Sequence, residues 1–376
     1  MWSYWEHSTF IKNPELLIIG SGITGLSAAI AYKQLKPTAD VLILEAGHLP
    51  SGASTKNAGF ACFGSPGELL LDLEHTKPDQ VFDLLQKRFD GLQHLRNWIG
   101  DHNLQFESPG SYELFDRFDS LEAALGQLSF LNKESKKRIG HAPFFQYDQI
   151  LSSGSFKNFC GAIQIRGEGQ IHTGRMMKNL IDIAIEKGIR ILSGLKAEKI
   201  EPYSLFVNVQ TESGFIKAQN CLVATNGFAR RLLPELTSFP ARAQVLITKP
   251  IKNLKFQGTY HFDQGYYYFR NVGNRVLFGG GRNLAMEEET TDQIALNQGI
   301  QDHLINLLKE RILPNTPFEI DQQWSGIMGV GFDKKPIVKQ VTNRVYSAVK
   351  LGGMGVAIGT MIGHEIAESI YHGKSP

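Results

Sequence analysis

Three glycines near the N-terminus stand at a spacing that binds phosphate. Gly20, Gly22 and Gly25 follow the apolar run LLII and open a stretch of helical composition. The first glycine suits a tight turn, the second lets a pyrophosphate approach the backbone, and the third lets a helix pack closely on a strand. The free N–H groups and the positive end of that helix would face the phosphates. The spacing therefore predicts a dinucleotide site.

An acid follows at the position that a ribose requires. Glu45 closes the apolar run VLILE, about 20 residues beyond Gly25, where a carboxylate accepts hydrogen bonds from a ribose diol. An acid there also disfavours the extra phosphate of NADP. This motif alone does not distinguish FAD from NAD.

A second glycine turn lies near the other end of the chain. The apolar run VYSAV leads into LGGMG and then into a helical segment, so strand, glycine turn and helix recur. NAD needs one helix N-terminus for its pyrophosphate. A flavin adds a second electron-rich group, its pyrimidine edge, which another helix N-terminus stabilises. The two turns together favour FAD.

The elements that position these turns indicate two domains. The chain has 376 residues, more than a single hydrophobic core usually supports. Strands and helices alternate around the glycine turns, which predicts an α/β fold with a Rossmann-like FAD-binding domain. Short aromatic strands from Ala241 to Trp324 predict a second, α+β substrate domain built on an antiparallel sheet. We expect the FAD-binding domain to comprise residues 1–90, 160–235 and 325–376, and the substrate domain 91–159 and 236–324. Helices are expected over 67–99, 120–140 and around 292–310.

Composition and charge argue against several classes of protein. The chain carries 39 Lys and Arg against 37 Asp and Glu, so its net charge of +2 offers no electrostatic case for nucleic acid or an anionic membrane. No segment approaches the roughly 18 uninterrupted apolar residues of a membrane span, and the N-terminus lacks the pattern of a signal peptide. A cytoplasmic protein is expected. Cys62, Cys160 and Cys221 show neither metal-ligand spacing nor a disulfide framework, and no metal is expected. The oligomeric state stays open.

Several motifs occur together along nearly the whole chain: IIGSGITGLSAA, Glu45, SGASTKNAGF, ATNG, Trp324-Ser325-Gly326 with Asp333 and Pro336, and the closing GGMG helix. In this combination the sequence resembles the FAD-dependent D-amino-acid oxidase superfamily, which includes glycine oxidase, sarcosine oxidase and gamma-glutamylputrescine oxidase. The resemblance implies a non-covalent FAD, because no cysteine lies near Met328, where some relatives attach the flavin.

The resemblance also implies which residues bind FAD. They are Gly20, Ser21, Gly22, Ile23, Thr24 and Gly25 at the pyrophosphate, Glu45 and Ala46 at the ribose, Ser51, Gly52, Ala53 and Ser54 beside the diphosphate, Asn57, Ala58 and Gly59 beside the flavin ring, Ala197 at the adenine, Ala224, Thr225, Gly227 and Gly326 on the returning strands, and Gly352, Gly353, Met354, Gly355 and Val356 along the pyrimidine edge.

An aromatic strand is expected to face the substrate. In GYYYFR, Tyr266 and Tyr268 share one face and Tyr267 points the other way. The family places substrate-facing aromatics on this strand, which favours Tyr266 and Tyr268. The alternative, that these rings simply pack in the core, stays open.

Met328 departs from the glycine oxidase pattern. That branch has an arginine here to bind the amino-acid carboxylate, and a thioether cannot replace it. Arg270 or Arg282 could supply the charge, although either could equally be structural. The arginine-free WSGIMG is closer to the gamma-glutamylputrescine oxidase branch, so an amine or N-substituted amine is the preferred substrate.

We therefore predict an FAD-dependent oxidoreductase that oxidises the C–N bond of a small amine or N-substituted amino acid by hydride transfer, giving an imine that hydrolyses. Dioxygen or another acceptor would take the electrons, and Lys350 is a candidate to assist dioxygen. His172 and His261 are expected to be structural. Two alternatives remain: a flavin-dependent 2-hydroxy-acid dehydrogenase, and a non-catalytic flavoprotein subunit of a complex.

Overall fold

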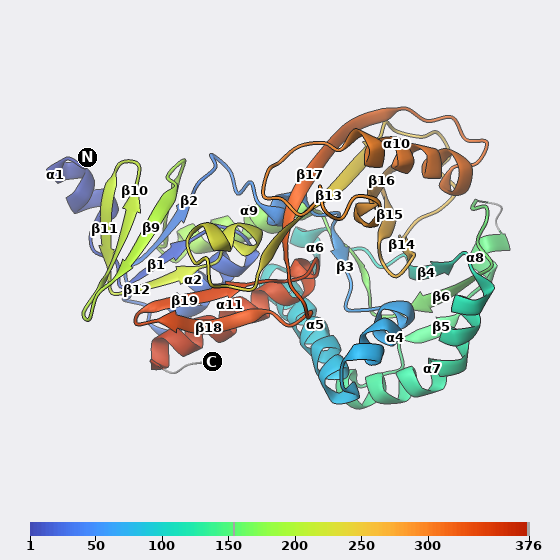
Figure 1. Ribbon diagram of the computed structural model, residues 1–376, viewed down its shortest axis with the longest axis horizontal. Coiled ribbons are helices and arrows are strands. Elements are labelled where there is room, and N and C mark those ends of the chain that lie inside the picture. Colours follow the sequence, from blue (N-terminus) through green and yellow to red (C-terminus); the bar gives the residue numbers. More distant parts are fainter. Residues whose placement is uncertain (153–154, 374–376) are drawn as a thin grey trace.

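The protein consists of two halves that lie side by side, each organised around one large β-sheet (Figure 1). The structure is a computed structural model that describes residues 1–152 and 155–373. Both ends of the chain lie in the half that contains the six-stranded sheet. The predicted fold class, a Rossmann-like domain with a second α+β domain, is confirmed.

The six-stranded sheet is parallel apart from its edge strand β18. Its strands run in the order β18 (Ile337–Thr342), β19 (Val345–Val349), β12 (Asn220–Val223), β1 (Leu16–Ile19), β2 (Val41–Glu45) and β8 (Arg190–Ser193). Strands β1 and β2 are buried along their whole length, as expected for continuous apolar runs in a parallel sheet. Because β1 lies between β12 and β2, the strand order reverses there, and ligands bind at the carboxyl ends of strands at such points.

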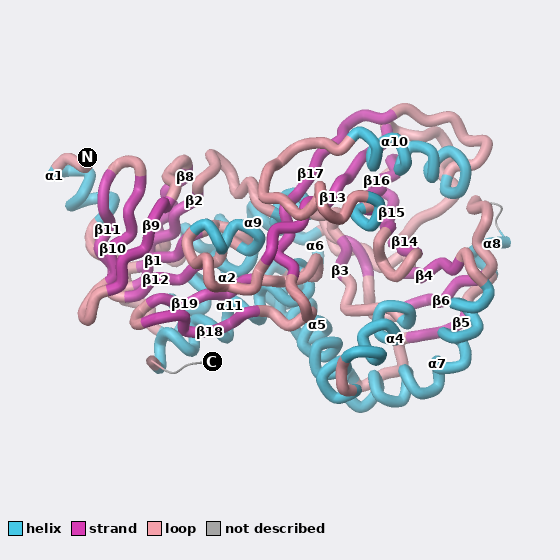
Figure 2. The backbone as a smooth tube through the Cα atoms, in the orientation of Figure 1, coloured by secondary structure: helices cyan, strands magenta, loops and turns pink. Residues whose placement is uncertain are grey.

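Helices and a small sheet cover the two faces of this sheet. On one face pack α2 (Ile23–Leu35), α5 (Pro78–Ile99), α9 (Thr173–Glu186) and α11 (Gly355–His372). On the other pack the π-helical turn η1 (His7–Ile11) and the antiparallel strands β9 (Ala197–Pro202), β10 (Val207–Thr211) and β11 (Gly214–Ala218). The small sheet lies at one end of the molecule, beside α1 (Tyr4–Glu6) (Figures 1 and 2).

The second half is built on an eight-stranded sheet. Its order is β17 (Ile320–Val330), β13 (Phe239–Thr248), β16 (Arg275–Gly280), β15 (Tyr267–Val272), β14 (Thr259–Phe262), β4 (Ser111–Phe115), β6 (Gly161–Ile165) and β5 (Phe144–Gln146). Neighbouring strands are antiparallel except β14 and β4. One face packs its aromatic residues against α10 (Gln298–Leu307) and the turn η4 (Leu308–Ile312). On the other face, α4 (Pro66–His75) and α7 (Phe118–Ile139) cover the end near β5.

One row of residues crosses this second sheet in register. Val245 pairs with Gly279, Gly279 with Tyr268, Tyr268 with His261, and His261 with Glu113. Directly paired residues share a face of the sheet, so these five side-chain positions form a line from β13 to β4. We call this line the cross-strand row. It joins residues that lie more than a hundred positions apart in the sequence.

Short elements complete the chain. They are α3 (Ala53–Lys56), α6 (Asp101–Leu104), α8 (Gln149–Ser152), β3 (Phe60–Ala61), β7 (Gly169–Gln170) and the 3-10 turns η2 (Asn226–Arg231) and η3 (Arg282–Leu284). Within the part of the chain that the structure describes, no helix combines the length and apolar character needed to cross a bilayer.

The structure corrects some predicted boundaries. The helical region over 67–99 divides into α4 and α5, because Pro78 begins a new helix. The helix expected around 292 begins only at Gln298, after the N-cap Asn297. Strand β6 and all of β17 belong to the eight-stranded sheet, whereas the predicted division at residues 160 and 325 placed 161–165 and 325–330 with FAD. The end of α5 beyond residue 90 packs in the core of the first half instead.

Candidate active site

A cavity of about 1400 Å³ lies between the two sheets and is lined by both halves. Small-molecule sites usually measure a few hundred to about 1000 Å³, so this cavity has room for a dinucleotide beside a substrate. We call the side formed by the six-stranded sheet and its glycine turns the cofactor wall, and the side formed by the eight-stranded sheet the substrate wall.

The first glycine turn brings the N-terminus of α2 to the cavity. A Cβ at Gly25 would lie 2.0 Å from the carbonyl oxygen of Gly20, so only glycine permits this close packing of helix and strand. Gly20 has a φ of +104°, and a Cβ there would lie 2.9 Å from the carbonyl oxygen of Ala224. The Oγ of Ser54 accepts the N–H of Ile23 at 3.0 Å. Gly22, Ile23 and Thr24 line the cavity, so the helix end faces it, as a phosphate site requires.

Glu45 lies at the end of β2 as a buried carboxylate held by neutral donors. Its Oε2 accepts the backbone N–H of Ser21 at 3.1 Å and the Ser21 hydroxyl at 2.7 Å. Its Oε1 accepts the N–H of Gly47 at 2.9 Å. No described cation pairs with it. Among the described residues, Oε1 accepts only the bond from Gly47 and so keeps acceptor capacity in a residue that lines the cavity, which fits the predicted contact with a ribose diol.

The loop after α3 is fixed by its own side chains and by the second half. The Oδ1 of Asn57 accepts the N–H of Gly59 at 2.8 Å and the hydroxyl of Thr173 at 3.0 Å. The indole N–H of Trp324, on β17, donates to the carbonyl of Lys56 at 2.9 Å. This loop forms the corner where the cofactor wall meets the substrate wall.

The second glycine turn presents the N-terminus of α11 to the same cavity. Gly352 and Gly353 have positive φ values, and a Cβ at Gly352 would meet nothing within 4 Å. The Oδ1 of Asn226 accepts the N–H groups of Lys350 at 3.0 Å and of Leu351 at 3.3 Å, which fixes the turn. Thr225 also lines the cavity, and its buried Oγ1 makes no hydrogen bond to a described residue. An open helix end and an unpaired hydroxyl fit a flavin along this wall.

Most of the predicted FAD residues line the cavity: Gly20, Gly22, Ile23, Thr24, Glu45, Ala46, Ser51, Gly52, Ala53, Ser54, Asn57, Ala58, Ala197, Ala224, Thr225, Gly326, Gly352, Gly353, Met354, Gly355 and Val356. Ser21, Gly25, Gly59 and Gly227 lie behind this lining. Ser21 holds Glu45, and the three glycines allow close backbone packing against Gly20, Ile171 and Met328 respectively.

The three tyrosines of GYYYFR point to two opposite sides of the sheet, as strand alternation predicts. Tyr266 and Tyr268 line the cavity, whereas Tyr267 stacks on Phe262 in the opposite core, with ring centroids 5.0 Å apart. The ring of Tyr268 fills the space over Gly279, and burial raises the pKa of its hydroxyl to about 12. It therefore stays protonated at neutral pH. Met328 lines the cavity beside the second glycine turn.

His261 also lines the cavity, although it was expected to be structural. It lies next to Tyr268 in the cross-strand row. Burial lowers its pKa to about 4, so the imidazole is neutral, and its buried Nε2 makes no hydrogen bond within the described ranges. The sequence carries no local signal for this placement, because it follows from the pairing of β14 with β15.

The two candidate arginines lie in different environments. Arg270 is buried, and its guanidinium donates to the backbone carbonyls of Ala58, Ile171 and Asn271. It lies outside the cavity lining and ties the loop after α3 to β15. Arg282 lines the cavity, its Nε is buried without a partner, and none of its nitrogens makes a hydrogen bond or ion pair with a described residue. Only Arg282 is free to bind a ligand.

Lys350 does not reach the cavity. It is 5% exposed with a φ of +66°, and its ammonium pairs with Asp333 at 2.7 Å. The geometry thus gives no support to its predicted role with dioxygen, since the ion pair directs its charge behind the glycine turn. The lysines in the lining are Lys56, Lys196 and Lys334, which the sequence motifs did not single out.

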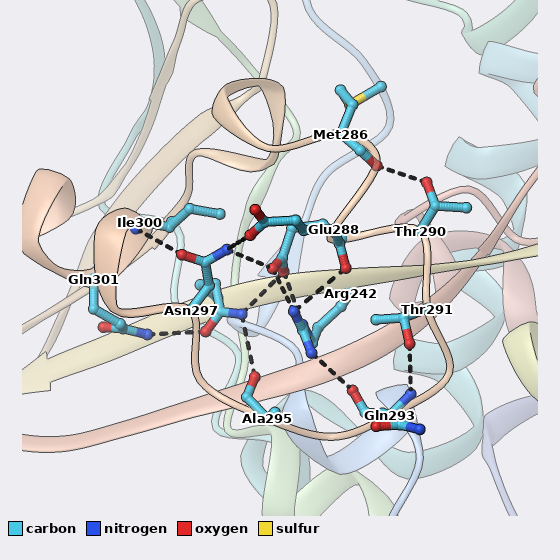
Figure 3. A network of polar contacts seen from close by, with 12 residues as sticks. Arg242, Met286, Glu288, Thr290, Thr291, Gln293, Ala295, Asn297, Ile300 and Gln301 are labelled. Atoms are coloured by element: carbon cyan, nitrogen blue, oxygen red, sulfur yellow. Dashed lines mark hydrogen bonds and ion pairs between the residues drawn. The ribbon is translucent and has the colours of Figure 1, made fainter.

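A buried ion pair anchors the irregular segment that contributes Arg282, Asp292, Gln293 and Ile294 to the lining. Arg242, on β13, donates from two nitrogens to the carboxylate of Glu289, at 3.0 and 2.7 Å. Figure 3 shows Asn297 and Gln293 in the same network, which continues to Gln301 on α10. Glu289 is fully buried, so this pair fixes the wall that carries Arg282.

The fold and the two glycine turns define an FAD-binding oxidoreductase. A family model described as FAD dependent oxidoreductase (DAO) matches residues 15–369. The chain belongs to this family, and FAD is its cofactor.

Individual proteins resemble it over nearly its whole length. A Rhizobium meliloti protein named "Probable oxidoreductase OrdL" is 25% identical over 95% of this chain and 83% of its own. The gamma-glutamylputrescine oxidoreductase of Escherichia coli is 24% identical, covering 94% and 83%. Among solved structures, L-proline dehydrogenase from P. horikoshii has a TM-score of 0.79 with 17% identity, covering 97% of this chain and 95% of that one. Glycine oxidase from Bacillus cereus has a TM-score of 0.76 with 16% identity, covering 96% of each.

Proposed function

We propose that this enzyme oxidises the C–N bond of a small amine or N-substituted amino acid, giving an imine that hydrolyses. The observation that carries the proposal is the free guanidinium of Arg282 in the same cavity as Tyr266 and Tyr268, opposite two helix N-termini suited to FAD. The gamma-glutamylputrescine oxidoreductase among its relatives supports an amine substrate. Dioxygen or another electron acceptor would complete the cycle.

The cofactor wall would hold FAD through the N-termini of α2 and α11 and through Glu45. Bound FAD supplies the acceptor for the hydride of the substrate carbon. The residues of the chain position the substrate and exclude water. Tyr268, Phe60 and Met328 present a weakly polar surface, and burial against such a surface lowers the pKa of an amine. The neutral amine needed for C–N oxidation is thereby favoured without a dedicated base.

Arg282 would bind a carboxylate of the substrate. Its planar guanidinium suits bidentate pairing with a carboxylate, and no described residue forms a hydrogen bond or an ion pair with it. Met328 cannot take this role, and Arg270 is bound to three backbone carbonyls. A substrate carboxylate at Arg282 would lie at the end of β16, next to Tyr266 on the substrate wall.

The test is an anaerobic substrate panel with the purified yellow protein. Amines, N-methyl amino acids and 2-hydroxy acids are added separately, flavin absorbance is followed, and air is then admitted. We expect amines or N-methyl amino acids to bleach the flavin. Bleaching by hydroxy acids alone would identify a 2-hydroxy-acid dehydrogenase instead. Failure of every compound, with a stable hetero-complex, would indicate a non-catalytic subunit. Return of the colour in air would identify dioxygen as an acceptor.

A further inference from the structure

The cavity ends, on the side of α4, in a group of carboxylates that the proposed reaction does not use. Glu68 and Glu168 line the cavity there, and Glu113 lies directly behind them at the end of the cross-strand row. Burial raises the pKa of both Glu113 and Glu168, and the charge of Glu68 adds to the rise, so the three groups lie within electrostatic reach of one another. We call this group the acidic end.

Cations of the chain neutralise only one part of the acidic end. Arg88 and Lys334 both pair with Glu68, at 3.0 and 2.9 Å, and Lys334 also pairs with Asp72. Glu113 and Glu168 pair with no cation in the described part of the chain. When these two carboxylates are ionised, no described cation compensates their charge.

Glu168 is held in place by neutral donors. Its Oε1 accepts the N–H groups of Phe63 at 2.7 Å and Gly64 at 3.1 Å, and its Oε2 accepts the hydroxyl of Ser111 at 2.6 Å. The residue is 2% exposed, yet it contributes to the lining. Burial raises its pKa to about 7, so a cation that arrived beside it would favour the ionised form.

His261 provides a second, independent feature at this end. Its buried Nε2 has no partner in the described chain, and it lines the same cavity. A neutral imidazole nitrogen can accept a hydrogen bond from an ammonium group, which the neighbouring carboxylates attract. A buried polar atom without a partner is costly, and a ligand that donates to it removes that cost.

The acidic end lies well away from Arg282 on the substrate wall. His261 is on β14 and Arg282 follows β16, with β15 between them. Strands are about 4.8 Å apart, so the two features are separated by roughly 10 Å across the sheet. Tyr268, the neighbour of His261 in the cross-strand row, lies on the intervening strand β15. The cavity can therefore receive an extended substrate.

We propose that Glu168 and His261 form a recognition subsite for a cationic nitrogen at the end of the substrate remote from the oxidised C–N bond. The substrate class is then an amine or amino acid that carries a second ammonium group. This inference rests on the proposed function, because it takes the cavity to be the substrate site. It assigns specificity, and not catalysis, to the two residues.

The test compares matched ligands that differ in one distal charge. Lysine is compared with norleucine, and diaminobutane with butylamine. Equilibrium binding to the FAD-loaded protein is measured by calorimetry, and flavin bleaching is followed anaerobically. We expect the dication of each pair to bind at least about 10-fold more tightly, the effect of one hydrogen bond to a charged group. Glu168→Gln should abolish this preference.

The glutamine variant separates recognition from a purely structural role. Its amide oxygen can still accept from Phe63 and Gly64, and its NH₂ can donate to Ser111, so thermal stability and FAD content should be retained. A merely structural Glu168 would leave the preference for dications unchanged in this variant, which would overturn the proposal. Glu122→Gln removes an exposed carboxylate from α7 in the same half and should leave the preference intact.

The two proposals fail in different ways. Bleaching of the flavin without any preference for the dication would keep the amine oxidation and reject the subsite. A preference that depends on Glu168, without bleaching by any amine, would keep the subsite and reject the oxidation. If no ligand of either pair binds, the subsite is rejected, and the wider panel of amines and N-methyl amino acids decides the oxidation.

Discussion

The two walls of the cavity are built in different ways. The cofactor wall consists mainly of backbone, with helix N-termini at two glycine turns and small side chains between them. The substrate wall consists of side chains that five strands bring together in the cross-strand row. A backbone site depends on the close packing of a short segment, whereas a side-chain site depends on register. Substitutions should therefore affect stability and FAD on the first wall and selectivity on the second.

The largest effect is expected at Gly25. A Cβ there would lie 2.0 Å from a backbone oxygen that cannot move without displacing β1. We expect Gly25→Ala to cost at least about 4 kcal/mol and to yield protein without FAD. Unfolding by urea and the ratio of flavin to protein absorbance measure both quantities.

A glycine in an exposed helix gives the matched control. Gly126 lies in α7, and a Cβ there would meet nothing within 4 Å. Gly126→Ala should therefore raise stability by about 0.5–1 kcal/mol and leave FAD bound. A Gly25→Ala protein that keeps its flavin would show that the close packing of α2 is not required.

The next largest effect is expected at Arg270, and it distinguishes this arginine from Arg282. Arg270→Met leaves the carbonyls of Ala58 and Ile171 without their buried donor, which we expect to cost about 4 kcal/mol and to lower FAD content. Arg282→Met removes a guanidinium that makes no hydrogen bond or ion pair with residues 1–152 and 155–373, so stability should change by less than about 0.5 kcal/mol. Denaturant titration of both variants decides whether Arg270 supports the fold and Arg282 does not.

The pH dependence of stability tests the acidic end. Burial raises the pKa of Glu113 and Glu168 to about 7, whereas an unfolded glutamate has a pKa near 4.5. The folded state thus retains protons that the unfolded state has released. The contribution of these groups to the free energy of unfolding is complete below pH 4.5. It decreases as the pH rises towards 7 and is constant at higher pH. Each group accounts for at most about 3 kcal/mol.

Glu168→Gln isolates one of these contributions. Relative to the unmodified protein, this variant should be more stable at pH 8 than at pH 5, as measured by urea unfolding at both values. Glu122→Gln, at an exposed position, should show no such difference. A Glu168→Gln protein whose relative stability is independent of pH would contradict the raised pKa.

The smallest effect concerns selectivity alone. Arg282→Met should reduce kcat/KM for an amino acid by about 10-fold relative to the amine that lacks its carboxylate, because one charged pair is lost. Arg117→Met, at an exposed position that pairs with Asp119, serves as the control. Equal losses for both substrates would place the carboxylate elsewhere.

The cofactor wall could be predicted because its determinants are local. Gly20, Gly22 and Gly25 act within one turn, and Glu45 follows at a fixed distance along the same strand-helix-strand unit. The same holds for Gly352 and Gly353 before α11. In each case residues that are neighbours in the sequence are also neighbours in space, so the spacing of residue types is enough to predict the site.

The substrate wall could be predicted only in part. Strand alternation placed Tyr266 and Tyr268 on the opposite side from Tyr267 without any knowledge of partners. Their neighbours His261 and Glu113 could not be found this way, because strand register is set by tertiary packing.

The charged residues were the hardest to place from sequence. Arg270 and Arg282 look equivalent in the sequence, and only the carbonyls around Arg270 distinguish them. The left-handed backbone of Lys350 and its pairing with Asp333 likewise depend on the folded chain. The uncompensated charge of Glu168 became visible only when the partners of Arg88 and Lys334 were known.

The most direct test of the account is a crystal structure of the FAD-loaded protein with a slowly reacting amine. We predict that the flavin ring lies between the Asn57–Ala58 segment and the Gly352–Met354 turn, and that the amine lies over Tyr268. A flavin placed elsewhere, or an amine bound outside the cavity, would contradict the assignment of the two walls.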